Sequence, residues 1–247
     1  MKGLSLHIGI NKVDSQAYKP MNITELSGCQ NDAIDMRSIA DKIGYLSTIL
    51  LTEAATYQNV VNTINWAIKK LEKNDIFLLT YSGHGGQIID KNGDEKDGLD
   101  ETWVLYDRQI TDDELYSLWS KFVEGVRIVV ISDSCHSGTI AKSGLNGSAE
   151  KVINNIKNGL ADKSLTKCLA SGILISSSQD NQVSFDMGKN GLFTSKLLEV
   201  WNDGKFKGTY KQFRNSISSK LSRIQSPNYL TFGKSNLRFS RQIPFTI

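Results

Sequence analysis

The sequence predicts an α/β fold in which helices cover both faces of a mostly parallel sheet. Two observations support this prediction. Short apolar runs alternate with longer amphipathic segments along the chain, and several of the runs are apolar at consecutive positions. Parallel strands that are buried on both faces have that continuous pattern. The 247 residues, 39% hydrophobic and 22% charged, are typical of a globular protein, and we expect one domain over residues 1–247.

The strands are expected where short runs of apolar and β-branched residues occur. These runs are Leu4–Ile10, Ser47–Leu51, Ile76–Tyr81, Val126–Ile131 and Ile173–Ser176. A further run, Tyr229–Phe232, follows Pro227 and is expected to form a late edge strand.

The helices are expected between these runs, where apolar residues recur on one helical face. The segments are Asp32–Ile43, Thr56–Leu71, Asp112–Phe122, Gly191–Trp201 and Tyr210–Ile224. Two segments interrupt the alternation. Asp90–Asp100 is an acidic loop, and Thr139–Ala170 is polar, rich in lysine and long for a connection inside a domain.

Composition and charge argue against several classes of protein. The net charge of +3 is nearly balanced and no basic run occurs, so no nucleic-acid partner is expected. The three cysteines, Cys29, Cys135 and Cys168, are too sparse for a disulfide framework and favour a reducing compartment. The N-terminus does not resemble a signal peptide, and no apolar stretch reaches the roughly 18 residues of a membrane helix. We therefore expect a cytoplasmic protein with no membrane partner.

Two of the predicted strands lead into residues that carry chemistry. Ile76–Tyr81 is followed by Ser82-Gly83-His84-Gly85-Gly86, and Val126–Ile131 by Ser132-Asp133-Ser134-Cys135-His136. If the two strands are neighbours, His84 and Cys135 emerge side by side at the carboxyl edge of the sheet. An imidazole beside a thiol promotes the reactive thiolate. The backbone N–H groups of Gly85 and Cys135 are then candidates for an oxyanion hole.

The pattern alone leaves a structural interpretation open. A lone cysteine is more often a small buried apolar residue than a nucleophile, and this interpretation is preferred for Cys29 and Cys168. His7 lies inside an apolar strand and is expected to be structural, and His136 is expected to point away from its neighbour Cys135. Residue pattern by itself therefore supports a Cys–His dyad and a structural role about equally.

Six segments of the chain resemble the metacaspases, relatives of caspases in plants, fungi, protists and bacteria. They are Leu26–Ala33 (LSGCQNDA), Tyr81–Gln87 (YSGHGGQ), Asp97–Thr102 (DGLDET), Asp133–Thr139 (DSCHSGT), Gln179–Gln182 (QDNQ) and Gly191–Thr194 (GLFT). The resemblance spans about residues 5 to 235 in the family's order, and the spacing from His84 to Cys135 fits the roughly 50 residues between the catalytic His and Cys of caspases. It implies a caspase-hemoglobinase fold with a mostly parallel six-stranded sheet.

The resemblance also implies an activity, a cysteine endopeptidase that works through an acyl-enzyme. Cys135 matches the nucleophile and His84 the base of this family. Asp32 and Asp133 match its acidic substrate pocket, with Cys29 and Ser82 beside them, and two carboxylates suit the forked guanidinium of an Arg substrate, or Lys. In the alternative interpretation, Asp32 favours a helix N-terminus and Asp133 orients its loop.

A calcium site is the one cofactor that the resemblance suggests, as an activator that the chemistry does not require. Asp100, Asp112 and Asp113 match the family's acidic ligands, and carboxylates suit this ion. Lys142 stands where the family often has another aspartate, which is expected to weaken or abolish calcium binding. Thr111-Asp112-Asp113-Glu114 is alternatively a helix N-terminus, where negative charge is favourable.

Regulation and partners are expected to follow the same family. Thr139–Ala170 occupies the place of a flexible inter-subunit linker, with Lys142, Lys151, Lys157, Lys163 and Lys167 but no arginine for efficient self-cleavage. We expect a monomer that cuts protein or peptide substrates in regulatory proteolysis or in a death or defence response, with an activating partner protein as one way of switching it on. Two alternatives stay open: a catalytically silent binding scaffold, and a protease of this clan that does not prefer basic residues.

Overall fold

The computed structural model describes residues 1–89, 99–136, 167–177, 189–221 and 227–247, with the backbone alone at positions 135 and 136. Its strands form one sheet, in which six lie side by side. Their order is β2 (Leu46–Leu51), β1 (Gly3–Gly9), β3 (Ile76–Ile89), β6 (Arg127–His136), β7 (Ser171–Ser176) and β8 (Asn228–Gly233). All neighbours in this order are parallel except β7 and β8, which are antiparallel. The expected mostly parallel sheet with a late edge strand is therefore confirmed.

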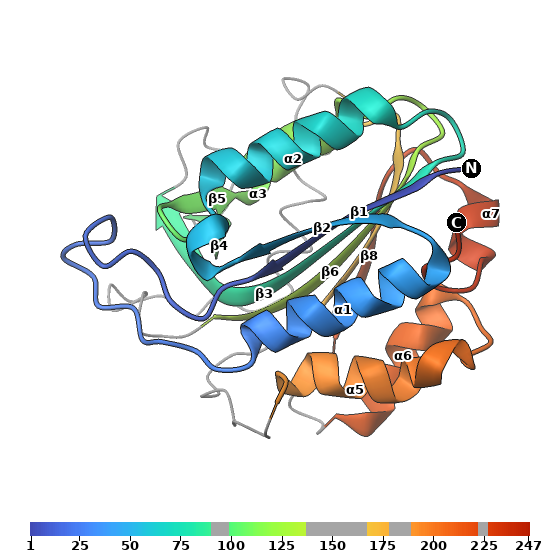
Figure 1. The fold of residues 1–247 in the computed structure, drawn as a ribbon. Helices are drawn as coiled ribbons and strands as arrows, with labels where there is room; N and C mark the ends of the chain where they lie inside the picture. The colour runs from blue at the N-terminus through green and yellow to red at the C-terminus, as the bar shows by residue number, and fades with distance from the viewer. Residues whose placement is uncertain (90–98, 137–166, 178–188, 222–226) are drawn as a thin grey trace.

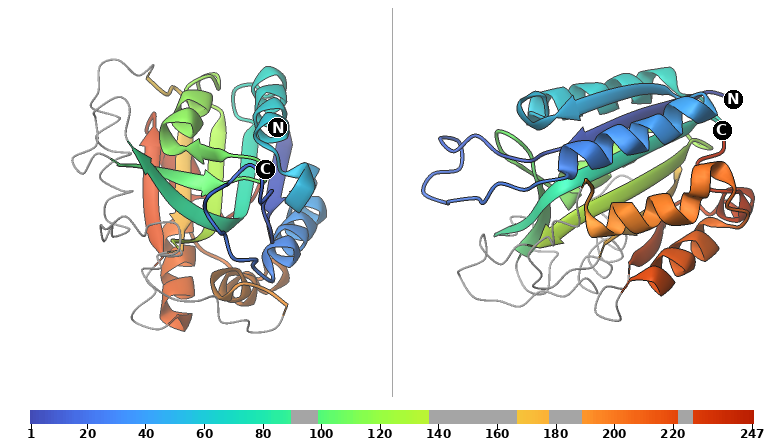
Figure 2. Two further views of the ribbon diagram at one scale, coloured as in Figure 1. Left: turned by 90° about the vertical axis from the view of Figure 1, so that its left-hand side faces the viewer. Right: turned by 60° about the horizontal axis from the view of Figure 1, so that its bottom comes forward.

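Helices cover the sheet on both faces, as Figure 1 shows. One face carries α2 (Tyr57–Lys70) and α3 (Asp112–Trp119), and the other carries α1 (Cys29–Ile43), α5 (Leu192–Trp201) and α6 (Tyr210–Lys220). The short helix α7 (Leu237–Arg241) and two 3₁₀ turns, η1 (Thr52–Ala54) and η2 (Asn202–Gly204), complete the described helices. The two termini lie close together at one end of the molecule (Figures 1 and 2).

Two hydrophobic cores lie on the two faces of the sheet, which explains the continuous apolar runs. Along β3, Phe77 and Leu79 belong to the core beneath α2 and α3, whereas Ile76 and Leu78 belong to the core beneath α1, α5 and α6. Successive side chains of a strand point to opposite faces, so a strand with two covered faces must be apolar at every position. Each such side chain stabilises the fold by about 1.5–3 kcal/mol relative to an exposed position.

The carboxyl edge of the sheet differs most from the expectation. The strands β3 and β6 continue well past Tyr81 and Ile131, so the segments expected as loops are strand extensions. The extension of β3 pairs antiparallel with β4 (Leu99–Val104), which pairs with β5 (Gln109–Thr111); neither of these strands was expected. The glycines of Ser82–Gly86 and the charged residues of β4 are unfavourable in strands, so the sequence pattern did not indicate strands there. Pairing with neighbours on both sides overrides these weak local preferences.

Helix bounds differ from the expectation by a few residues. The first helix begins at Cys29 and not at Asp32, and α3 ends at Trp119. Among the described helices, none is both long enough and apolar enough to cross a membrane. Most of the lysine-rich segment, from 139 to 166, and most of the acidic loop, from 90 to 98, lie outside the described residues.

Candidate active site

The neighbouring strands β3 and β6 bring His84 and Cys135 together. Their register pairs Ser82 with Asp133 and His84 with Cys135. Both strands end at the carboxyl edge of the sheet, where open α/β folds bind ligands. The predicted juxtaposition of the two residues is thus present in the backbone, and it depends on strand pairing and not on two mobile loops.

The imidazole of His84 has a defined orientation. Its Nε2 atom lies 2.7 Å from the carbonyl oxygen of Thr24, which can only accept a hydrogen bond. In the neutral ring Nε2 therefore carries the hydrogen, and Nδ1 carries the lone pair that a base needs. Burial lowers the pKa of His84, although the Thr24 carbonyl acts in the opposite direction. Burial thus favours the neutral form of the ring.

The backbone around His84 is also fixed. The Tyr81 hydroxyl donates a 2.6 Å hydrogen bond to the His84 carbonyl oxygen. Gly85, the next residue, pairs with His136 of β6 and with Trp103 of β4. The backbone N–H groups of Gly85 and Cys135 thus belong to adjacent strands, one register position apart. Their use as an oxyanion hole remains a prediction.

The Asp32 carboxylate is buried at 2% exposure and accepts three hydrogen bonds. Its Oδ2 atom accepts from the Ser82 hydroxyl at 2.7 Å. Its Oδ1 atom accepts from the Asn190 side-chain amide and from the Gly191 backbone N–H, each at 3.0 Å. The predicted neighbours Asp32 and Ser82 are therefore in contact, and the segment before α5 joins them.

The Asp133 carboxylate meets the same segment from β6. Its Oδ2 atom accepts hydrogen bonds from the Thr194 backbone N–H at 3.1 Å and from the Thr194 hydroxyl at 2.8 Å. A Cβ atom built on Gly191 would lie 2.8 Å from Asp133 Oδ2 and 3.0 Å from Asp32 Oδ2. Both carboxylates therefore converge on Gly191, where only glycine leaves room for them.

The two carboxylates cap a helix that has no side-chain cap of its own. The N-cap residue of α5 is Gly191, and the N–H groups of Gly191 and Thr194 belong to its unpaired first turn. Negative charge at this end is favourable to the helix dipole. The alternative interpretation of Asp133, orientation of its own loop, stays open, and the structure adds that its side chain bonds α5.

Asp32 and Asp133, the acid pair, both have raised pKa values. The pKa of Asp32 is raised to about 7, first by burial and second by the negative charge of Asp133. Burial likewise raises the pKa of Asp133, although the Thr194 bonds oppose that shift. Two buried carboxylates that share a site resist simultaneous ionisation. A cation placed between them would relieve this repulsion.

A third carboxylate extends the acidic site along α1. Asp35 lies one helical turn after Asp32, and it accepts a 3.0 Å hydrogen bond from the Asn190 amide, which thus bridges the two aspartates. The Lys189 ammonium forms an ion pair with Asp35 at 3.1 Å. The residues before α5 are therefore tied to α1 by side-chain bonds.

The predicted calcium ligands lie at the beginning of α3 and on β4. The pKa of Asp112 is raised to about 8, first by burial and then by the charges of Glu101, Asp113 and Asp100. Oxygen ligands suit calcium. In the part of the chain that the structure describes, however, no three acidic, His or Cys side chains converge as a metal site requires. Lys142 lies outside the described residues.

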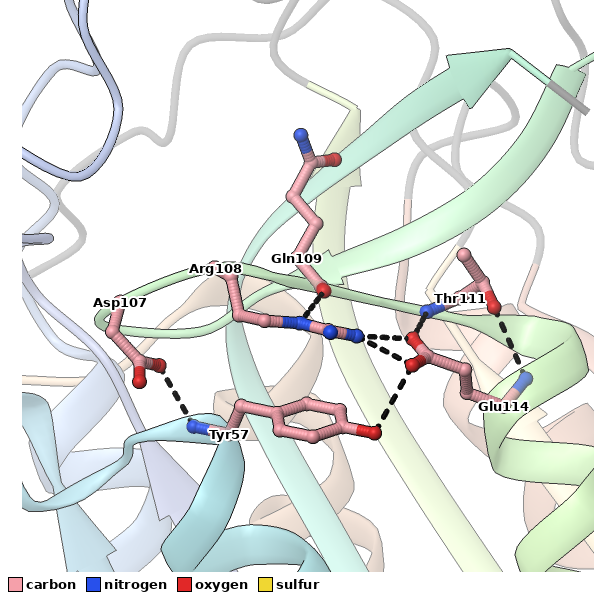
Figure 3. A network of polar contacts seen from close by, with 6 residues as sticks. All are labelled: Tyr57, Asp107, Arg108, Gln109, Thr111 and Glu114. Atoms are coloured by element: carbon pink, nitrogen blue, oxygen red, sulfur yellow. Dashed lines mark hydrogen bonds and ion pairs between the residues drawn. The ribbon is translucent and has the colours of Figure 1, made fainter.

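The beginning of α3 is rigidly held (Figure 3). Thr111 and Glu114 form a reciprocal capping box, which confirms the helix N-terminus expected there. The Arg108 guanidinium pairs with the Glu114 carboxylate and lies 3.6 Å from the centre of the Tyr57 ring. The Tyr57 hydroxyl donates to Glu114 at 3.0 Å, and the Tyr57 backbone N–H donates to Asp107 at 2.7 Å. This network ties α3, and with it Asp112, to the start of α2.

His7 and Cys168 have the contacts of structural residues. The buried ring of His7 contacts the hydroxyls of Thr80 and Ser5, each at 2.9 Å, and burial lowers its pKa to about 3. Burial raises the pKa of Cys168 to about 11 and keeps the thiol protonated. Cys29 is buried one turn before Asp32 on α1.

Three contacts within the candidate site had no signal in the residue pattern. The Thr24 carbonyl is a backbone atom, which any residue would supply. The contacts of Asn190 and Thr194 with the acid pair depend on how α5 docks against the sheet. The segment Gly191–Thr194 was identified by its resemblance to the family, but the sequence did not indicate which residues it contacts.

Comparison with known proteins places the chain in a family. The caspase domain family, Peptidase_C14, matches residues 2–244. Metacaspase-1 of Schizosaccharomyces pombe is 30% identical over 82% of this chain, and that of Saccharomyces cerevisiae strain YJM789 is 28% identical over 80%. The chain spans 59% and 57% of the lengths of these two relatives.

Solved structures agree with this placement. The crystal structure of protein GSU0716 from Geobacter sulfurreducens is 41% identical, with a TM-score of 0.83, and the match covers 100% of this chain and 99% of that one. A structure of pro-sf-caspase-1 shares the fold at 11% identity and a TM-score of 0.58, over 93% of this chain and 86% of that one. The chain belongs to the caspase domain family.

Proposed function

We propose that this protein is a cysteine endopeptidase that cleaves peptide bonds after arginine and, less readily, lysine. The observation that carries the proposal is the position of two acids beside the dyad. Asp133 lies two residues before Cys135 on β6, and its register partner Ser82, two residues before His84, binds Asp32. A cationic side chain held by these acids would place its backbone at the carboxyl edge of β3 and β6.

The proposed chemistry uses only groups of this chain and one water molecule. Nδ1 of His84 takes the thiol proton of Cys135, and the sulfur attacks the carbonyl carbon of the scissile bond. The Gly85 and Cys135 N–H groups would stabilise the resulting oxyanion. When the C–N bond breaks, His84 returns the proton to the leaving amine. Water then hydrolyses the thioester, with His84 taking its proton, and regenerates the Cys135 thiol.

The preference for a cation follows from electrostatics. Because burial raises the pKa values of both acids, and the charge of Asp133 raises that of Asp32 further, ionising both acids in the folded protein costs free energy. A guanidinium favours the ionised forms of both carboxylates and can donate to both. An acidic substrate side chain would add a third negative charge, and an apolar one would leave the repulsion in place.

Cleavage of matched fluorogenic peptides that end in Arg, Lys, Asp or Leu tests the proposal. We expect Arg to give the highest kcat/KM, Lys to follow, and Cys135→Ala to be inactive on all four. Labelling of the wild type with an electrophilic Arg peptide should be lost in Cys135→Ala. A preference for Asp or Leu would refute the specificity, and absence of selective labelling would favour a scaffold.

Activation is part of the same proposal. Because a lysine replaces an expected calcium ligand at Lys142, we propose that calcium acts weakly if it acts at all, and activity with calcium and then with a chelator measures this.

We also propose that self-cleavage in the lysine-rich segment is slow. Mass spectrometry of the wild type beside Cys135→Ala shows whether fragments depend on the nucleophile. The compartment, the oligomeric state and an activating partner remain predictions.

A further inference from the structure

A cavity lies on the opposite face of β6 from the acid pair. It has a volume of about 100 Å³, is partly open to solvent, and is lined by residues of α3, β4 and the adjacent strands β6, β7 and β8. The strand alternates faces, so Asp133 turns toward α5 while Ser132 and Ser134 line the cavity beneath α3. The cavity therefore touches the strand that carries Cys135 but takes no part in the proposed chemistry.

The floor of the cavity is graded from apolar to polar. The register aligns Val130 with Leu174, and Phe232 of β8 lies on the same apolar side with Trp119 of α3. Each of these four side chains is at most 9% exposed. An occupant of this end would bury an apolar group.

One step toward the catalytic edge, the floor becomes polar. The register places Ser132, Ser176 and Asn228 side by side across three strands. Ser132 and Ser176 are at most 9% exposed, and the Ser132 and Ser134 hydroxyls lie 3.1 Å apart. A rung of buried polar residues is unusual in a sheet face packed under a helix, because apolar side chains would stabilise it more.

The end at the catalytic edge is acidic. Helix α3 runs from Asp112 to Trp119, and both of its ends line the cavity, so its length separates an acidic end from an aromatic one. Glu101 and Thr102 of β4 join Asp112 at the acidic end. The sequence of apolar, hydroxyl and carboxylate groups matches a small molecule with an apolar body and a cationic head.

We propose that this cavity binds a small amphipathic amine, with its apolar body against Leu174, Phe232 and Trp119 and its ammonium group toward Asp112 and Glu101. A partly open cavity of about 100 Å³ accommodates part of a small apolar group, and the rest of the ligand would extend along the polar floor. The ammonium donates hydrogen bonds to carboxylate and hydroxyl oxygens, and the apolar end excludes water. The ligand would rest against Ser132 and Ser134, the two neighbours of Asp133.

Binding of 2-phenylethylamine tests the site, with 2-phenylethanol as the uncharged analogue of the same shape. Calorimetry in chelator-treated buffer keeps metal ions away from Asp112. We expect saturable binding of the amine with a Kd of about 1 mM or below, and at least about fivefold weaker binding of the alcohol. Equal affinity for the two would refute the amine class, and absence of saturable binding would refute the site.

Ser176→Leu places an isobutyl group on the polar rung and should weaken amine binding by at least about tenfold. Ser117→Leu is the matched control, because the same substitution lies on the exposed side of α3. It should leave the Kd unchanged. If Ser176→Leu does not fold, Asp112→Asn gives a second test, with a loss of the preference for amine over alcohol. Unchanged amine binding in folded Ser176→Leu, or unchanged preference in Asp112→Asn, would overturn the proposal.

Discussion

The acid pair Asp32–Asp133 and the acidic group around Asp112 differ in how the fold treats buried negative charge. Both have raised pKa values for the same first reason, burial. The acid pair, however, accepts hydrogen bonds from Ser82, Gly191 and Thr194. The carboxylate of Asp112 accepts one from the Asp113 backbone N–H, and the charges that perturb it are acidic.

From this difference we expect the two sites to bind cations differently. The acid pair is oriented by donors that include Gly191 and Thr194, so we expect it to select a cation by geometry as well as charge. The acidic group around Asp112 concentrates negative charge, so we expect it to attract cations by charge. Oriented carboxylates should therefore control specificity, while the Asp112 group should mainly respond to charge.

The largest effect is expected from Asp133→Asn. The variant keeps the shape of the side chain, but it removes one charge and replaces one of the two acceptor oxygens with an NH₂ donor. Loss of one partner from a buried charge interaction costs about 2–5 kcal/mol, so kcat/KM for an Arg peptide should fall roughly 30-fold or more. Steady-state kinetics checks this. An unchanged kcat/KM would mean that the pair only caps α5.

The next effect is a pH dependence that the acid pair should show. Ionised Asp32 attracts a cation and protonated Asp32 does not, so affinity should rise with pH up to the pKa of about 7 and then level off. Below that pKa, the Kd of an Arg peptide for Cys135→Ala should increase up to about tenfold for each pH unit lost. Fluorescence titration between about pH 5 and about pH 9 measures it.

A citrulline peptide is the matched ligand, because it keeps the shape of arginine without its charge. Its Kd should vary little over the same range. Equal pH profiles for the two peptides would contradict the role of the acid.

The free energy of unfolding should change with pH in the opposite direction to binding affinity. Because folding raises the pKa of Asp32 above its unfolded value near 4, its ionisation weakens the fold as pH rises from about 4 to about 7.

Thr194→Val isolates the helix-capping part of the acid pair. Valine keeps the branched shape and the backbone N–H but loses the hydroxyl that donates to Asp133 at 2.8 Å. The free energy of unfolding should fall by about 1–3 kcal/mol, the cost of a lost bond to a buried acceptor. Thr194→Ser keeps the hydroxyl and loses one methyl group, so it should cost about 0.8 kcal/mol. Denaturant unfolding of both variants decides, and a larger loss in the serine variant would mean that packing dominates.

Asp112→Asn should raise the free energy of unfolding, whereas Thr194→Val should lower it. Because folding raises the pKa of Asp112 to about 8, ionisation of this group destabilises the fold progressively between about pH 4 and about pH 8. Asparagine removes that repulsion, so stability above pH 8 should increase by about 1 kcal/mol, with no gain below about pH 4. Thermal unfolding in chelator measures the difference. A loss of stability above pH 8 would show that the carboxylate is stabilised by a partner.

The sequence predicted the sheet better than the site, and the reason is physical. Doubly buried strands such as Ile76–Tyr81 must be apolar throughout, so their pattern is visible in isolation. The extension through His84 is polar and rich in glycine, and only its pairing with β4 and β6 makes it a strand. His84, Cys135 and the acid pair were found by family resemblance. Their contacts with Thr24 and Thr194 arise from chain segments far apart in sequence, whose docking no local pattern encodes.

The smallest effect should come from Lys189, at the rim of the acid pair. Its ammonium pairs with Asp35 at 3.1 Å but is 63% exposed, and exposed ion pairs contribute only about 0–1 kcal/mol. Lys189→Ala removes a positive charge near the pocket, so KM for an Arg peptide should fall, by at most about fivefold, with kcat unchanged. Lys196→Ala breaks a similar pair with Glu199 on the far part of α5 and should leave KM unchanged. A rise in KM would instead mean that Lys189 holds Asn190 in the position that orients Asp32, so that orientation outweighs charge even at the rim.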